Sequence, residues 1–257
     1  MSYISDLAYI IFTSGSTGIP KGVQITHMAA NNTIKDINQR YDISEKDSVL
    51  ALSKLNFDLS VYDIFGLLSV GGTIVFPNRK SYLDATHWSE LLSKHAITVW
   101  NTVPSLMQML LEGLEQKNEE SISLRVVLLS GDWIPVLMPS NIWKYNKETR
   151  IIGLGGATEA SIWSNYYECN KEDIYRESIP YGYPLSNQSY KILNSKMQEC
   201  PDWVPGELYI LGKGVAKGYI NNYKLTESQF MINPLTQERM YRTGDYGYYE
   251  PDGKIIF

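Results

Sequence analysis

The stretch from Thr13 to Gly22 reads Thr-Ser-Gly-Ser-Thr-Gly-Ile-Pro-Lys-Gly, and these residue types suit a nucleotide polyphosphate. Glycines let backbone N–H groups approach an anion closely, hydroxyl side chains add donors, and Lys21 adds a mobile positive charge. A flexible linker has a similar composition. We favour a phosphate loop because the apolar run Leu7–Phe12 precedes the stretch and the alternating residues Val23–Ile25 follow it, which predicts a strand on each side.

This loop differs from the Walker type, which needs Gly-Lys-Ser/Thr at the start of a helix. Here Pro20 precedes Lys21 and Gly22 follows it. The next helix is predicted only from His27 to Gln39, with Thr26 as its N-cap. The phosphates are therefore expected on a strand–loop–strand arrangement, and a kinase-like or GTPase-like protein is disfavoured.

Strand-like and helix-like segments alternate through the first two thirds of the chain, which predicts an α/β fold with a mainly parallel sheet and flanking helices. From about Asn165, frequent Gly, Pro, Tyr and Asn with short alternating apolar runs indicate a β-rich, distorted barrel-like subdomain. We predict two subdomains, residues 1–165 and residues 166–257. The predicted strands cover residues 48–52, 73–76, 97–102, 125–129 and 150–153, and the predicted helices cover residues 61–68, 87–94 and 104–115.

Composition bounds the class of protein. The chain has 257 residues and a net charge of −5, which disfavours nucleic acid as the main partner. No apolar run reaches transmembrane length and the first residues form no signal peptide, so we expect no membrane partner and a reducing, cytoplasmic setting. The two cysteines, Cys169 and Cys200, show no metal-binding spacing.

Five motifs follow one another along nearly the whole chain: Thr13–Gly22, Asn56–Asp63, Gly155–Glu159, Gly206–Tyr219 and Tyr241–Asp245. In this order they resemble the adenylate-forming enzymes, and more closely the amino-acid adenylation domains of nonribosomal peptide synthetases. The resemblance implies ATP-dependent activation of an amino acid as aminoacyl-AMP, with Mg²⁺. It also implies transfer to the phosphopantetheine thiol of a carrier protein and contact with neighbouring synthetase modules.

The resemblance implies that three of these motifs, Thr13–Gly22, Gly155–Glu159 and Tyr241–Asp245, contact the nucleotide. The last of them would bind the ribose and lies in the β-rich subdomain. Lys21, Thr158 and Glu159 are the implied catalytic residues, and Glu159 would hold Mg²⁺ through a hard oxygen. Asp245 would accept hydrogen bonds from the ribose. Outside this context, Glu159 is typical of a helix N-terminus and Asp245 of a turn. The residues implied to contact ATP are Thr13, Ser14, Gly15, Ser16, Thr17, Gly18, Lys21, Gly131, Gly155, Thr158 and Asp245.

Asp58 is implied to pair with the α-ammonium group of the substrate, a charge that acyl- and aryl-CoA ligases have no need to match. The implied substrate residues are Asp58, Leu59, Tyr62, Asn101, Leu128, Ser130, Leu154, Ile162 and Trp163. This apolar lining lacks a second charge and predicts a small, weakly polar side chain, because burying an unpaired ionic group is costly. Cysteine fits best, and the set resembles cysteine-activating domains; glycine, alanine and serine stay open.

Three positions depart from a simple assignment. Asp63, one helical turn beyond Leu59, is expected on a solvated helix face. Gly155 stands where the family usually has an aromatic residue that stacks on adenine, so adenine contacts are expected elsewhere, for example from backbone near Gly131 and Asp132. The chain begins at the phosphate loop and ends at Phe257, before the subdomain that normally supplies a catalytic lysine.

These ends predict an adenylation core truncated on both sides. Two further hypotheses stay open beside amino-acid activation. One is a non-catalytic remnant that binds ATP or a partner protein. The other is an acyl- or aryl-CoA-type ligase, which Asp58 disfavours.

Overall fold

The computed structural model describes residues 3–14 and 20–257, which form two compact units. The parallel-sheet unit comprises Ile37–Leu154 and Tyr167–Ile179, and the antiparallel unit comprises Met1–Asp36, Gly155–Tyr166 and Pro180–Phe257. This division differs from a single boundary at residue 165. The start of the chain groups with its end because β2 (Lys21–Thr26) pairs with β12 (Gly218–Tyr219).

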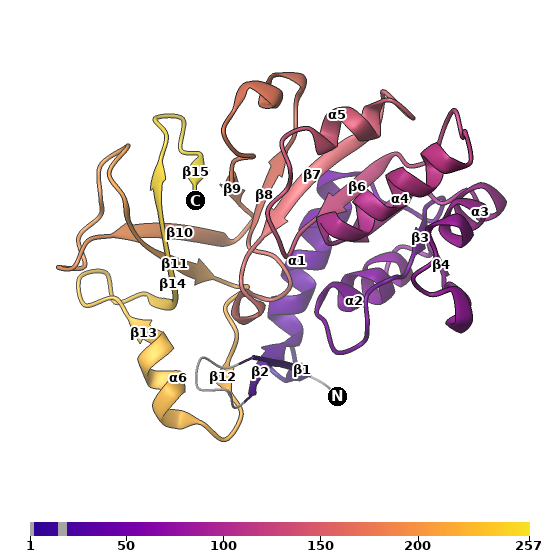
Figure 1. The fold of residues 1–257 in the computed structure, drawn as a ribbon. Helices are drawn as coiled ribbons and strands as arrows, with labels where there is room; N and C mark the ends of the chain where they lie inside the picture. Colours follow the sequence, from indigo (N-terminus) through magenta and orange to yellow (C-terminus); the bar gives the residue numbers. More distant parts are fainter. Residues whose placement is uncertain (1–2, 15–19) are drawn as a thin grey trace. The chain divides into compact units, whose positions relative to one another are not determined.

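In the parallel-sheet unit, α3 (Ala85–His95), α4 (Pro104–Gln116) and α5 (Met138–Trp143) pack on one face of a sheet (Figure 1). The strands lie in the order β4 (Thr73–Val75), β3 (Ser48–Leu50), β5 (Val99–Thr102), β6 (Val126–Leu129) and β7 (Arg150–Gly155), and these five are parallel. β8 (Asn165–Glu168) follows β7 in the strand order. The three helices share a buried core with the sheet.

Local sequence signals explain where several helices begin and end. The Asp84 carboxylate accepts hydrogen bonds from the amides of Thr86 and His87 at the start of α3. Pro104 opens α4 at a position where its missing N–H costs no hydrogen bond. α1 (His27–Arg40) begins after Thr26, whose hydroxyl accepts from the amide of Ala29 at 3.3 Å. The predicted N-cap of this helix is therefore confirmed.

The antiparallel unit contains two antiparallel sheets. β1 (Leu7–Thr13), β2 and β12 form one of them. The other has the order β10 (Gln188–Leu193), β11 (Gly206–Gly212), β14 (Arg239–Tyr249) and β13 (Phe230–Ile232), with β15 (Ile255–Ile256) also paired to β14. This order is open, so the described strands do not close into a barrel. The remaining elements of the unit are β9 (Tyr183–Pro184), η3 (Thr158–Ala160) and α6 (Tyr223–Gln229).

The parallel-sheet unit also contains short helical segments. α2 (Leu59–Val61) continues directly into η1 (Tyr62–Gly66), which is a π-helix. The 3₁₀ segments are η2 (Arg79–Ser81) and η4 (Lys171–Tyr175). In the described ranges, no helix is long and apolar enough to cross a membrane.

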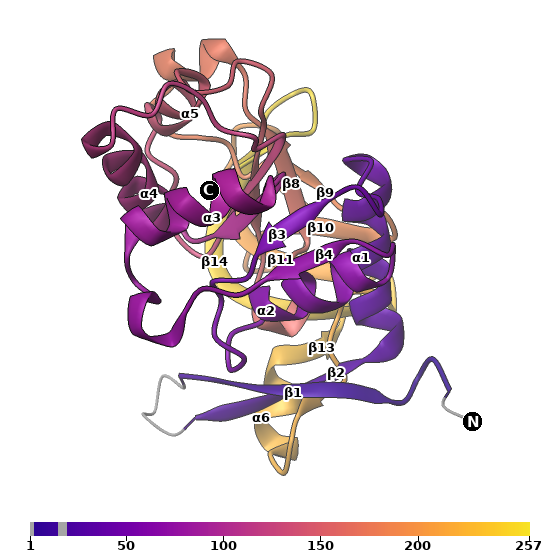
Figure 2. The ribbon, with the colours of Figure 1, turned by 90° about the vertical axis from the view of Figure 1, so that its right-hand side faces the viewer.

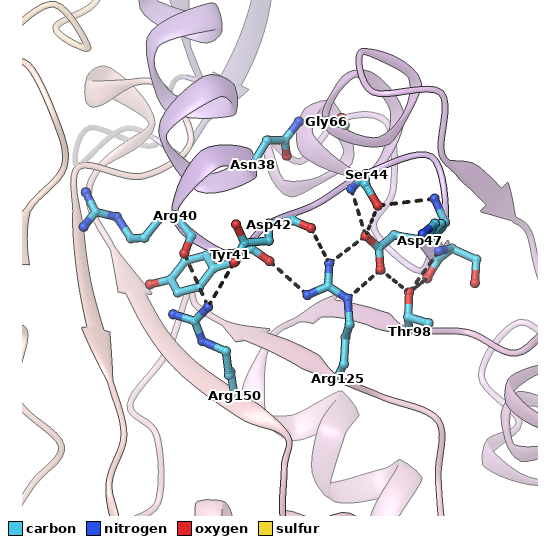
Figure 3. Close-up of polar contacts among 12 residues, drawn as sticks. Asn38, Arg40, Tyr41, Asp42, Ser44, Asp47, Gly66, Thr98, Arg125 and Arg150 are labelled. Atoms are coloured by element: carbon cyan, nitrogen blue, oxygen red, sulfur yellow. Dashed lines mark hydrogen bonds and ion pairs between the residues drawn. The ribbon is translucent and has the colours of Figure 1, made fainter.

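The amino-terminal ends of the parallel strands are joined by a polar network around Asp47 and Arg125 (Figure 3). The Arg125 guanidinium binds both carboxylate oxygens of Asp47 at 2.7 and 2.6 Å and donates to the carbonyls of Tyr41 and Asp42 at 2.9 Å each. Asp47 also accepts from the hydroxyl of Thr98 at 2.7 Å. One arginine thus connects the start of β6 to the segment after α1 and to the residue before β3.

Burial raises the pKa of Asp47, but hydrogen bonds from Arg125, Thr98 and Ser44 outweigh it and hold the pKa below its ordinary value. A carboxyl with a lowered folded-state pKa stabilises the fold above its unfolded-state pKa of about 3.9, and this stability is lost as the pH falls through the folded-state pKa. The network therefore contributes fully at neutral pH.

We predict that Asp47→Asn lowers the free energy of unfolding by about 3 kcal/mol at pH 7, the low end for a buried pair that loses one charge. The difference from the wild type should begin to shrink below about pH 4, where the carboxylate of the unfolded wild type takes up a proton, and should shrink further as the pH falls through the lower folded-state pKa. Urea unfolding across pH tests this. The control is Asp42→Asn, which changes a carboxylate that is 87% exposed. A pH-independent difference for Asp47→Asn would contradict the account.

Candidate functional site

The phosphate-loop stretch connects two paired strands, as predicted. In the antiparallel β1–β2 pair, Thr13 lies opposite Lys21, so the hairpin holds the two ends of the loop side by side (Figure 2). The Thr13 hydroxyl is buried and has no hydrogen-bond partner among the described residues. Four of the implied ATP residues, Gly15, Ser16, Thr17 and Gly18, lie outside the described residues.

Lys21 and Glu159 are brought together within the antiparallel unit. The Lys21 ammonium lies 3.4 Å from Glu159 Oε1, and the Glu159 side chain is 6% exposed. Tyr219 completes the cluster, because its hydroxyl donates to Glu159 Oε1 at 2.6 Å and its ring centroid lies 5.0 Å from the Lys21 ammonium. Burial, and then the charge of Glu159, raise the pKa of Tyr219, so its hydroxyl remains a donor.

Two tyrosines in this cluster were not assigned a role from the sequence. Tyr219 is the last residue of the fourth motif, to which no side-chain role was assigned, and Tyr241 opens the motif that contains the implied ribose residue. Burial and the charge of Glu159 raise the pKa of Tyr241 as well. The tyrosine next to glycine in the fourth motif was the available signal, but only the β2–β12 pairing brings it to Glu159.

Glu159 fits a cation held together with a polyphosphate. Within the described residues, no group of three or more His, Cys, Asp or Glu side chains could hold a metal by itself. Mg²⁺ commonly takes one or two protein carboxylates and fills its other positions with phosphate oxygens and water. A single buried carboxylate beside a lysine at the end of a phosphate loop matches this second pattern.

Gly155 is a glycine because another side chain fills its space. A Cβ atom at this position would lie 2.3 Å from Cε2 of Tyr181. The Tyr181 ring also stacks on Phe257, with ring centroids 5.2 Å apart, and meets Tyr190 edge-on. An aromatic residue thus occupies the neighbourhood of Gly155 from a different part of the sequence. Gly131, the other implied adenine neighbour, belongs to the parallel-sheet unit.

Asp245 lies on an irregular part of β14. Arg242 pairs with Tyr209 and Tyr246 pairs with Glu207, so three residues of β14 stand opposite Leu208 alone. Such a bulge redirects side chains and is common next to active sites. Gly244 has a φ of 85°, which suits glycine. The bulge leaves Asp245 exposed to solvent.

In the parallel-sheet unit, strand register places four implied substrate residues on one face. Asn101 of β5 is opposite Leu128 of β6, which is opposite Ile152 of β7. Ser130 and Leu154 each lie two residues further along, and side chains two apart on a strand point to the same face. The alternate residues Trp100, Val127, Leu129 and Ile151 belong to the core shared with the helices. The four implied substrate residues therefore gather at the carboxyl ends of the strands, on the opposite face.

The α2–η1 segment and Asp58 just before it carry three further implied substrate residues, Asp58, Leu59 and Tyr62, all buried. The Tyr62 hydroxyl donates to Asn38 Oδ1 at 2.8 Å, and Asn38 donates to the carbonyl of Gly66 at 2.8 Å. The Tyr62 hydroxyl is therefore bonded to α1, and its ring is buried. π-helical turns are frequent at functional sites.

The expectation that Asp63 lies on a solvated helix face is wrong. Its side chain is fully buried and accepts a hydrogen bond from Asn101 Nδ2 at 2.7 Å. Burial raises the pKa of Asp63 to about 7, against the opposing effect of hydrogen bonds from Asn101 and the backbone of Ser53. The spacing from Leu59 placed Asp63 correctly on the helix but could not show that a strand covers that face.

Ile162 and Trp163 belong to the antiparallel unit, where both are buried. Ser161 and Ile162 have φ values of 66° and 71°. A β-branched residue at positive φ is strained, and such strain concentrates at functional sites. Thr33 donates from its hydroxyl to the carbonyl of Ser161 at 2.9 Å, which helps to hold this turn.

Comparison with known proteins fits this geometry. The model of the family described as AMP-binding enzyme matches residues 4–220, and the chain belongs to this family of adenylate-forming ligases. It is 49% identical over 254 residues to the anguibactin system regulator of Vibrio anguillarum, 48% to bacitracin synthase 1 of Bacillus licheniformis and 47% to pyochelin synthetase PchF of Pseudomonas aeruginosa. At least 98% of the chain is covered each time, but only 24%, 5% and 14% of these relatives.

The fold is that of a nonribosomal peptide synthetase adenylation core. A crystal structure of the nonribosomal peptide synthetase FmoA3 superposes with a TM-score of 0.93 at 37% identity, over 100% of this chain and 27% of that one. Forms of FmoA3 with bound AMPPNP and with bound α-methyl-L-serine-AMP superpose with TM-scores of 0.93 and 0.92. The predicted α/β fold and the predicted family are therefore confirmed.

We predict that Gly155→Ala lowers the free energy of unfolding by about 1–3 kcal/mol, because the added methyl overpacks the space filled by Tyr181. In the Tyr181→Leu background the same change should cost at least about 1 kcal/mol less, a coupling typical of contacting residues. Thermal unfolding of the four proteins measures it. Tyr223→Leu, at a tyrosine 84% exposed, is the control background. Additive effects of Gly155→Ala and Tyr181→Leu would contradict this packing.

Proposed function

We propose that this chain activates an amino acid, with cysteine as the best-fitting substrate, by joining its carboxylate to AMP from ATP. The observation that carries the proposal is the cluster of Lys21, Glu159 and Tyr219 at the end of the phosphate hairpin. Two of the relatives are bacitracin synthase 1 and pyochelin synthetase PchF, and FmoA3 has been solved with bound AMPPNP and with bound α-methyl-L-serine-AMP. The carrier protein and the neighbouring modules are proposed partners on the same grounds.

In this proposal a substrate carboxylate oxygen attacks the α-phosphorus of ATP, and the bond to the pyrophosphate oxygen breaks. Lys21 and the loop hydroxyls neutralise charge on the phosphates, and Thr158 lies next to Glu159 at the α-phosphate. Mg²⁺, when bound, would add charge neutralisation at the phosphate oxygens. Glu159 would hold it, with its carboxylate fixed by Tyr219. Asp245 would accept hydrogen bonds from the ribose hydroxyls.

Tyr181 is our proposed adenine neighbour in place of the family's aromatic residue at position 155. The Tyr181 ring fills the space beside Gly155. Burial is the main cause that raises the pKa of Tyr181, and the charge of the implied ribose residue Asp245 raises it further. Stacking between an aromatic side chain and a base contributes about 1–3 kcal/mol. This proposal replaces the earlier expectation of backbone contacts near Gly131 and Asp132.

The proposed preference for cysteine rests on the side chains of the parallel-sheet unit. Leu59, Leu128 and Leu154 are buried and apolar. The described residues offer two buried polar atoms without partners on the same face, Asn101 Oδ1 and Ser130 Oγ. A small side chain with a weak donor suits this mixture better than a large or ionic one.

Amino-acid-dependent ATP–pyrophosphate exchange tests the proposal, on this chain and on the full-length protein that carries it. We predict exchange with cysteine above the other small amino acids, and at least a 30-fold loss in kcat/KM for Asp58→Ala, because the α-ammonium loses its buried partner. The KM for ATP should change little. Asp202→Ala, at an exposed carboxylate, is the control.

The outcomes separate the competing hypotheses. Exchange by the full-length protein with no amino acid would favour a non-catalytic remnant. Exchange that depends on a fatty or aryl acid would favour the CoA-ligase alternative. Wild-type exchange in Asp58→Ala would remove Asp58 from the substrate site, and a preference for serine would change only the substrate.

A further inference from the structure

Asn101 is held by two acceptors from the α2–η1 segment. Its side-chain nitrogen donates to Asp63 Oδ1 at 2.7 Å and to the carbonyl oxygen of Leu59 at 3.2 Å. Asp63 and Asn101 are both fully buried. Both hydrogen bonds lie in the interior, so together they hold the Asn101 side chain in one orientation.

The identity of the partners fixes which end of the amide faces them. A backbone carbonyl only accepts, and the bonded carboxylate oxygen of Asp63 accepts as well, so both must face the NH₂ end of Asn101. Both amide hydrogens are then used. The remaining atom, Asn101 Oδ1, is buried without a hydrogen-bond partner among the described residues.

A buried acceptor without a partner is costly, and one in a native site calls for a ligand that donates to it. Ser130 Oγ, on the same face of the neighbouring strand, is also buried without a partner among the described residues. A hydroxyl can rotate to donate or accept, but an asparagine held at its NH₂ end offers only its oxygen. Asp63 and Leu59 are therefore the reason why Asn101 can only accept, whereas the Ser130 hydroxyl can donate or accept.

We propose that Asp63 is a positioning residue that makes Asn101 present only its amide oxygen, so that the site selects an amino acid whose side chain carries a hydrogen-bond donor. This inference rests on the proposed function, in which Asn101 is a substrate residue. Thiol and hydroxyl side chains meet the requirement. A side chain of equal size without a donor leaves Asn101 Oδ1 unsatisfied.

The matched substrates are cysteine and 2-aminobutyrate, in which a methyl group replaces the thiol. We expect the full-length protein to prefer cysteine by about tenfold in kcat/KM for exchange, a modest factor because the thiol is a weak donor. Asp63→Leu keeps the branching at Cγ but removes the stronger acceptor, so the preference should fall at least threefold. The KM for ATP should stay unchanged, which a general loss of structure would not allow.

The control is Asp47→Asn, a buried carboxylate of the same unit whose contacts are with Arg125, Thr98 and Ser44. It should lower thermal stability without changing the ratio between the two substrates. If Asp63→Leu does not fold, Asn101→Leu removes the acceptor itself and should abolish the preference.

An unchanged ratio in the folded Asp63→Leu variant, or in Asn101→Leu, would overturn the inference. So would a wild-type enzyme that uses both substrates equally well. These results can be told apart from failure of the proposed function. In that case the wild type shows no exchange with any amino acid, which would contradict both amino-acid activation and the positioning role of Asp63.

Discussion

The ion pair between Asp47 and Arg125 is the constraint on which the parallel-sheet unit depends. It joins the start of β6 to the residue before β3 and to the carbonyls that follow α1, while Thr98 adds the start of β5. Because the strands are parallel, fixing their amino ends also fixes which residues stand level at their carboxyl ends. The line of Asn101, Leu128 and Ile152 follows from that register. Backbone pairing between the strands maintains this register up to their carboxyl ends, so a folded protein with a weakened ion pair keeps the same residues level there.

In the antiparallel unit, the short strand β12 fixes the positions of the neighbouring segments. It pairs with β2, and the amide of Ala216, just before it, donates to the carbonyl of Glu159 at 2.8 Å. The end of the phosphate hairpin, the carboxylate proposed for Mg²⁺ and the tyrosine that holds this carboxylate are therefore joined through backbone pairing. Side chains that must move little between turnovers gain from such rigid support.

Sequence reasoning placed the regular elements well and failed for one polar residue that the fold buries. β1, β2, α1 and α4 follow from apolar periodicity, from the Thr26 cap and from Pro104. Asp63 was misplaced because a carboxylate on a helix is usually solvated, and only the strand carrying Asn101 makes it a buried partner. Gly155 stands where the family usually has an aromatic residue, and the structure adds that the ring of Tyr181 lies in the space beside it. Such local inconsistencies are typical of sites.

The sequence by itself determined the local elements, the strand–loop–strand form of the phosphate loop and the family, because these depend on neighbouring residues and on the order of five motifs. Only the tertiary structure decided that the first 36 residues group with the last third, that Tyr219 holds Glu159 and that Asp63 holds Asn101. Each of these depends on pairing between segments distant in the chain. Local propensity carries no information on such pairing, whereas strand register and burial do.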